Sequence, residues 1–155
     1  MTKGAKIEQK VTWQDWFALV ARLTLGAVLI FSGLSKILGP AEEFAAAIEK
    51  YQAVPPDLVM AVARFLPWIE YCVGGFLILG YCVRLSALSA GILWSLFISM
   101  LTASKLRGIV INDCGCFGSH GPHFSTLEAI ALDSLLLTLS VVLFLAKNHI
   151  FALDN

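Results

Sequence analysis

The chain has 155 residues, of which 58% are hydrophobic and only 14% are charged. Soluble domains usually carry about 25% charged residues, so this composition argues against a soluble protein. The formal net charge is zero, which gives no electrostatic basis for binding nucleic acid. A chain of this length forms one domain at most, so we expect 1–155 to be a single domain.

The apolar residues are grouped in four blocks. A helix needs about 20 mostly apolar residues to cross the hydrocarbon core of a bilayer. The blocks cover residues 16–38, 58–80, 85–104 and 126–146. Helices of a soluble protein are rarely so apolar on every face. The sequence therefore predicts an all-α protein, a bundle of four transmembrane helices in contact with the lipid bilayer.

The first block also resembles the apolar part of a signal peptide. Its apolar stretch is longer than such segments usually are, and no small-residue cleavage site follows it. We expect it to be a helix of the mature protein.

The connections between the blocks carry structural signals of their own. Residues 41–51 follow a Gly-Pro pair and place Phe44, Ile48 and Tyr51 on one face, which predicts a short amphipathic helix in loop 1. Residues 81–84 leave room only for a tight turn, so the second and third spans form an antiparallel hairpin. The longest connection, 105–125, is rich in glycine and holds two cysteines and two histidines.

An even number of spans places both termini on the same side of the membrane. Lys3, Lys6 and Lys10 precede the first span, and basic residues there favour cytoplasmic termini. The loop 105–125, which we call the cysteine loop, then lies on the outer side, where disulfides persist.

Cys114 and Cys116 are separated only by Gly115. Two residues of extended chain span at most about 7 Å, and a disulfide needs Cα atoms about 4.4–6.8 Å apart, so the pair can close. The ring is small and strained, which favours a bond that forms and breaks readily. Lys105 and Arg107 precede the pair, and positive charge stabilises the reactive thiolate. We expect a redox-active pair; two unpaired cysteines without a role are the plainer alternative.

A metal site is a second interpretation of the same loop. Cys114, Cys116, His120 and His123 have the spacing C-x-C-x3-H-x2-H. Four nitrogen and sulfur ligands could bind zinc or another soft metal. This spacing differs from common zinc patterns.

Cys72 and Cys82 have a different setting. Cys72 lies in the second span, and Cys82 lies at the membrane face opposite the cysteine loop. Buried cysteine usually behaves as a small hydrophobic residue. The alternative is that one of them continues an electron path across the bilayer.

Charged residues also occur inside the spans. They are Arg22, Lys36, Arg64, Glu70 and Asp133. Each costs about 2.5–3.5 kcal/mol near the centre of a span, so such residues face the bundle interior and mark function by default. We expect Lys36, Arg64 and Asp133 to converge below the cysteine loop, with Glu70 deeper. They are either ion pairs that lock the bundle, for example Lys36 or Arg64 with Asp133, or a polar pocket.

The polar pocket would have a role in redox chemistry. It would include Lys36, Arg64, Glu70, Cys72 and Asp133, and it would host a quinone headgroup or relay the protons released on thiol oxidation.

Three segments together resemble one family of membrane proteins. ARLTLG at 21–26 with FSGLSK at 31–36 resembles the first helix of the DoxX/MauE proteins, and YQAVP at 51–55 with LPWIE at 66–70 resembles their second. DCGCFG at 113–118 is similar to the MauE-type cysteine loop. The resemblance covers roughly residues 17–146.

This resemblance implies a four-helix protein of the bacterial inner membrane that takes part in thiol redox chemistry, with the cysteine loop in the periplasm. MauE proteins are tied to maturation of a disulfide-rich periplasmic subunit of methylamine dehydrogenase, alongside a thioredoxin-like partner. DoxX relatives accompany sulfur or quinone chemistry.

Three functional hypotheses follow. In the first, the chain is a thiol-disulfide oxidoreductase that exchanges electrons between Cys114/Cys116, a periplasmic thioredoxin-like partner and a membrane carrier such as quinone. In the second, it binds or transfers a metal through Cys114, Cys116, His120 and His123. In the third, it is a non-catalytic membrane anchor for a soluble oxidoreductase.

Overall fold

The computed structural model describes residues 13–108 and 125–146. These residues form five helices and no strand. The helices are α1 (Trp13–Leu38), α2 (Ala41–Tyr51), α3 (Pro56–Leu79), α4 (Val83–Leu106) and α5 (Thr126–Leu145). All except α2 are long and apolar enough to cross a membrane. The predicted all-α fold, with four spans and a short helix in loop 1, is confirmed.

The helix ends differ from the expected spans for identifiable reasons. α3 begins two residues early because Pro56 occupies its first position, where proline's missing N–H costs nothing. α4 continues through Lys105 and Leu106, so the helix includes the first residues assigned to the cysteine loop. It ends before Gly108, whose φ of 71° is the left-handed conformation that terminates helices.

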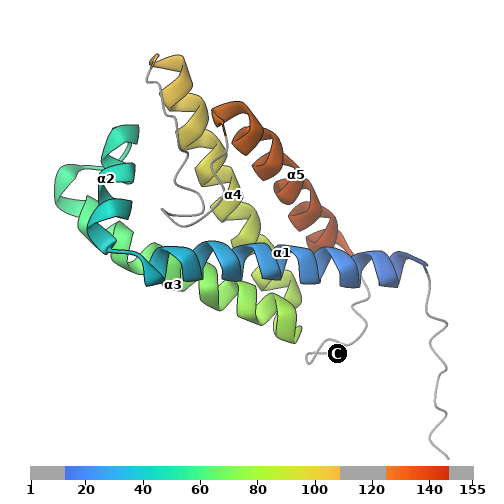
Figure 1. Ribbon diagram of the computed structural model, residues 1–155. Coiled ribbons are helices and arrows are strands. Elements are labelled where there is room, and N and C mark those ends of the chain that lie inside the picture. Colours follow the sequence, from blue (N-terminus) through green and yellow to red (C-terminus); the bar gives the residue numbers. More distant parts are fainter. Residues whose placement is uncertain (1–12, 109–124, 147–155) are drawn as a thin grey trace, which may run out of the picture.

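The four long helices form two pairs. Figure 1 shows α1 and α3 side by side, and α4 and α5 as a second pair inclined steeply to the first. A three-residue turn joins α3 to α4, with positive φ at Gly80 and Cys82. α2 packs through Ala45 and Ile48 against α3. The apolar face of this helix is therefore covered by protein.

Glycines bring the backbones of α1 and α3 into direct contact. A Cβ atom added at Gly33 would lie 2.6 Å from the carbonyl oxygen of Pro67, and one at Gly74 would lie 2.8 Å from that of Gly26. Close approach at small residues is a common way for helices to associate in membranes.

The core lies where the two pairs meet, and the outside of the molecule is apolar. Buried members of the core include Leu25, Leu29, Leu77, Trp94, Leu136 and Leu143. Large apolar side chains are also exposed on every spanning helix, among them Leu23, Phe65, Ile92 and Leu135. Such a surface suits contact with lipid chains rather than water.

The helix ends that flank the cysteine loop are held by specific hydrogen bonds. Arg107 donates from Nη1 to the carbonyl oxygen of Gln52 at 3.1 Å, which ties the end of α4 to the end of α2. At the start of α5, Ser125 Oγ accepts from the Glu128 N–H, and Glu128 Oε2 accepts from the Ser125 N–H at 2.9 Å. This capping box fixes where α5 begins.

Candidate functional site: a buried polar cluster among four helices

Lys36 and Glu70 form an ion pair inside the bundle. Lys36 Nζ lies 2.8 Å from Glu70 Oε1 and 2.9 Å from Oε2. Neither side chain is exposed. Two charges removed from solvent are stable only when their hydrogen-bonding capacity is filled, so the neighbouring groups decide whether this pair holds together.

Ser32 completes the hydrogen bonding of the pair. Its Oγ accepts a hydrogen bond from Lys36 Nζ at 2.9 Å and donates one to Glu70 Oε2 at 2.8 Å. The three N–H groups of the ammonium thus have three acceptor atoms within reach, and both carboxylate oxygens are bound. We refer to Ser32, Lys36 and Glu70 as the polar cluster.

The cluster follows from helix geometry. Ser32 and Lys36 are four residues apart and so lie on one face of α1. Side chains on a helix tilt towards its N-terminus, so Lys36 reaches back over Ser32 and away from the nearby end of α1. The contact of Gly33 with the α3 backbone brings Glu70 within reach of both side chains.

Two aromatic rings face the ammonium group. Lys36 Nζ lies 5.1 Å from the ring centroid of Phe44 on α2 and 5.2 Å from that of Phe97 on α4. Both distances are within the range of a cation–π interaction, which is stronger where water is excluded. Lys36 therefore joins α1, α2, α3 and α4.

This pairing corrects one of the alternatives drawn from the sequence. That alternative paired Lys36 or Arg64 with Asp133, whereas the salt bridge of Lys36 is to Glu70. The depth of a residue along its span suggested proximity to Asp133, but the backward tilt of the lysine side chain favours the deeper carboxylate. Sequence reasoning missed Ser32, Phe44 and Phe97; the four-residue spacing of Ser32 from Lys36 was the available signal.

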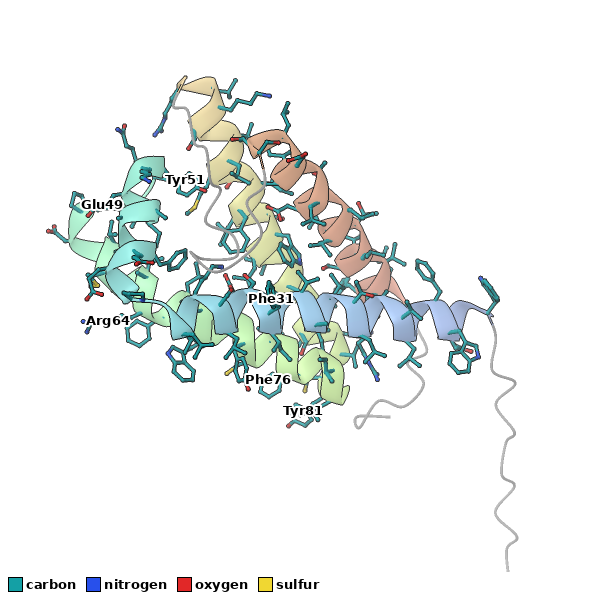
Figure 2. All side chains as sticks on the ribbon, in the orientation of Figure 1. Phe31, Glu49, Tyr51, Arg64, Phe76 and Tyr81 are labelled. Atoms are coloured by element: carbon teal, nitrogen blue, oxygen red, sulfur yellow. The ribbon has the colours of Figure 1, made fainter. Side chains whose placement is uncertain are left out.

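The remaining candidates from the spans lie in different places. Arg64 is exposed on the outer side of α3 near α2, as Figure 2 shows, and Cys72 is also exposed on α3. Asp133 is only 2% exposed and lies on the inward face of α5, in line with Ala129 and Leu136. The structure brings Lys36 and Glu70 together and leaves Arg64 and Cys72 on the surface.

The cysteines and histidines of the cysteine loop lie outside the described residues. They are Cys114, Cys116, His120 and His123. Cys82, by contrast, is a half-buried free thiol in the turn before α4. Within residues 13–108 and 125–146 there is no group of three or more histidine, cysteine or acidic side chains that could hold a metal ion.

Comparison with known proteins identifies the family. The family model described as "Methylamine utilisation protein MauE" matches residues 14–146. The chain belongs to the MauE family. This match includes nearly all of α1 and the whole of the other four helices, and with them the polar cluster and Asp133.

A curated MauE relative supports the same assignment. The "Methylamine utilization protein MauE" of Methylophilus methylotrophus is 30% identical to this chain over 130 residues, covering 81% of the chain and 68% of the relative. No solved structure matches the chain significantly. The four apolar helices and the MauE-family membership together describe a multi-pass membrane protein.

Proposed function

We propose that this MauE-family protein takes part in methylamine utilisation as a membrane thiol-disulfide redox protein, with Cys114 and Cys116 as its reactive pair. The Cys-Gly-Cys sequence in the loop between α4 and α5 carries this proposal. The names of the family and of its curated relative supply the metabolic context.

The proposed chemistry is thiol-disulfide exchange. A thiolate on one protein attacks the disulfide of the other, a mixed disulfide forms, and the second thiol of the attacking protein resolves it. One dithiol is thereby oxidised as one disulfide is reduced. When the loop dithiol closes to a disulfide at the membrane, two electrons and two protons pass to a carrier, which we propose to be a quinone reduced to its quinol. The relative reduction potentials of the three couples decide the direction.

The proposed topology follows the placement of the loop. With the termini in the cytoplasm of a bacterial cell, the cysteine loop faces the periplasm, where a soluble thioredoxin-like partner would meet it. α4 and α5 would hold the loop at the membrane surface, since its two flanks are fixed by the Arg107 contact and by the Ser125–Glu128 capping box.

The buried groups of the bundle would have separate roles. Phe97, whose ring faces the Lys36 ammonium group, lies eleven residues before Gly108, about 16 Å along the axis of α4. The polar cluster, whose hydrogen bonds are filled within the bundle, would hold the helices in place. Asp133, eight residues after Ser125, is about 12 Å deep and is our candidate for proton relay.

Thiol labelling of the full chain in native membranes tests the proposal. In a Cys72→Ser/Cys82→Ser background, we expect both remaining cysteines to react with a maleimide reagent only after reduction. Cys116→Ser should then trap a mixed disulfide with the thioredoxin-like partner, visible on non-reducing gels. Loop thiols that stay reduced under all conditions, with no loss of substrate oxidation when both are alanine, would contradict the proposal.

Metal analysis distinguishes the alternative function, metal binding by the cysteine loop, from the proposed redox function. If the loop binds metal, His120→Ala or His123→Ala should lower the bound metal about 10-fold or more, as expected for loss of a true ligand. If the pair is redox-active, the same variants should retain the titratable disulfide, and the purified protein should carry no stoichiometric metal.

A further inference from the structure

A groove runs between α4 and α5 on the outer surface of the molecule. Its volume is about 380 Å³ and its lining is almost entirely apolar. Ala87 and Ser140, both 1% exposed, form part of the floor, while Leu88, Ile92 and Val141 are about half exposed along the rim. The groove therefore opens away from the core, towards the space that lipid chains occupy around a membrane helix.

The hydroxyl groups of the groove are already used within their own helices. Ser95 Oγ donates to the carbonyl oxygen of Gly91 at 2.8 Å, and Ser140 Oγ donates to that of Leu136 at 2.9 Å. The groove thus offers no free donor to a polar headgroup. Its chemistry suits a hydrocarbon chain.

A positive charge marks one end of the groove. Phe144 lines the groove, and the guanidinium carbon of Arg84 lies 5.7 Å from the centroid of its ring. Arg84 is exposed in the first turn of α4. Within the described residues no carboxylate forms a salt bridge with it. The guanidinium group remains able to bind an anion.

The surroundings of Arg84 place it at the level of lipid headgroups. Tyr81, in the turn just before α4, is 52% exposed and packs against Phe76 with ring centroids 5.7 Å apart (Figure 2). Exposed tyrosines are typical of the membrane–water interface. The N-terminus of α4 has no side-chain cap at Cys82, so its first N–H groups add positive potential beside Arg84.

We propose that the groove between α4 and α5 binds one phospholipid with an anionic headgroup. An acyl chain lies along the groove from Ala87 to Ser95, and a headgroup phosphate whose charge no headgroup cation compensates pairs with Arg84. Arginine favours this role because its planar donors match phosphate oxygens in pairs. The proposal is independent of the redox function, since it uses no residue of the cysteine loop or of the polar cluster.

Native mass spectrometry of the full-length protein in detergent tests this site. The probes are phosphatidylglycerol and phosphatidylcholine with identical acyl chains. We expect one retained lipid per chain and about a five-fold preference for phosphatidylglycerol, the contribution of one basic residue at an anionic membrane surface. Arg84→Gln should bring the preference close to one. Ser95→Leu, which fills the groove, should lower retention of both lipids.

Matched variants control for general effects. Ser99→Leu changes another exposed serine of α4 that also donates to its own helix, but it lies outside the groove, so retention should be unchanged. Arg64→Gln removes an exposed arginine of α3 and should leave the five-fold preference intact. An unchanged preference in Arg84→Gln would overturn the proposal. Unchanged lipid retention in Ser95→Leu would overturn it as well. If that variant instead disrupted a dimer, the groove would be an interface between two copies of the chain.

Discussion

Lys36 Nζ contacts both carboxylate oxygens of Glu70, at 2.8 and 2.9 Å, with neither side chain exposed. The contact joins a lysine close to the end of α1 to a residue well inside α3. Removing one member leaves the other charge buried without its counter-ion, whereas removing both removes the cost of burying charge as well. We therefore expect each single variant to lose more stability than the double variant.

For Lys36→Met or Glu70→Leu alone, we expect the free energy of unfolding to fall by about 3–5 kcal/mol. In the double variant Lys36→Met/Glu70→Leu, most of that loss should be recovered. Denaturant titration in mixed micelles measures the free energy of unfolding of all three variants. Arg64→Gln, at an exposed position on α3, is the control and should change stability by no more than about 0.5 kcal/mol. Equal losses in single and double variants would argue against a tightly coupled pair.

Phe97 should stabilise the polar cluster through its contact with the lysine ammonium. Phe97→Leu removes both ring packing and the cation–π interaction, whereas in a Lys36→Met background only packing is lost. We expect a coupling energy of about 1–2 kcal/mol between the two positions, from the same unfolding titrations arranged as a double-mutant cycle. A coupling near zero would mean that the ring only fills space.

Two adjacent glycines in α3 should respond in opposite ways to alanine. A Cβ at Gly74 would lie 2.8 Å from the carbonyl oxygen of Gly26, so Gly74→Ala must push α1 and α3 apart. The expected cost is about 1–3 kcal/mol. At Gly75 nothing lies within 4 Å of the added Cβ, so Gly75→Ala should be neutral or should stabilise the helix by up to about 1 kcal/mol. Thermal unfolding compares them; similar results would contradict the close approach of the helices.

Asp133 is the residue on which the proposed proton relay depends. Asp133→Asn keeps the shape of the buried side chain but cannot ionise, so thiol oxidation in membranes should slow by about 100-fold if the carboxyl transfers protons. The neighbouring Ser134 is exposed on α5 and donates to its own helix, and Ser134→Ala should leave the rate unchanged. Unchanged turnover in a folded Asp133→Asn protein would remove this residue from the mechanism.

The sequence by itself determined the helices and their environment. Four apolar blocks of membrane-spanning length predict four transmembrane helices because the bilayer core requires internally satisfied backbone hydrogen bonds over about 20 residues. The amphipathic spacing of Phe44, Ile48 and Tyr51 likewise predicted α2. These features depend on the composition and the hydrophobic periodicity of single segments, which the sequence shows without knowledge of what each helix contacts.

Only the tertiary structure decided which buried charges meet. Lys36 and Glu70 are 34 positions apart, and their contact depends on the crossing of α1 and α3 at Gly33 and on the backward tilt of Lys36. The position of a residue along a span indicates its depth but not which neighbouring helix its side chain faces. Glu70 was therefore placed deeper than the other charged residues, although it is the partner of Lys36. The face of a helix on which a residue lies determines its contacts only once the neighbouring helix is in position, and helix packing sets that position.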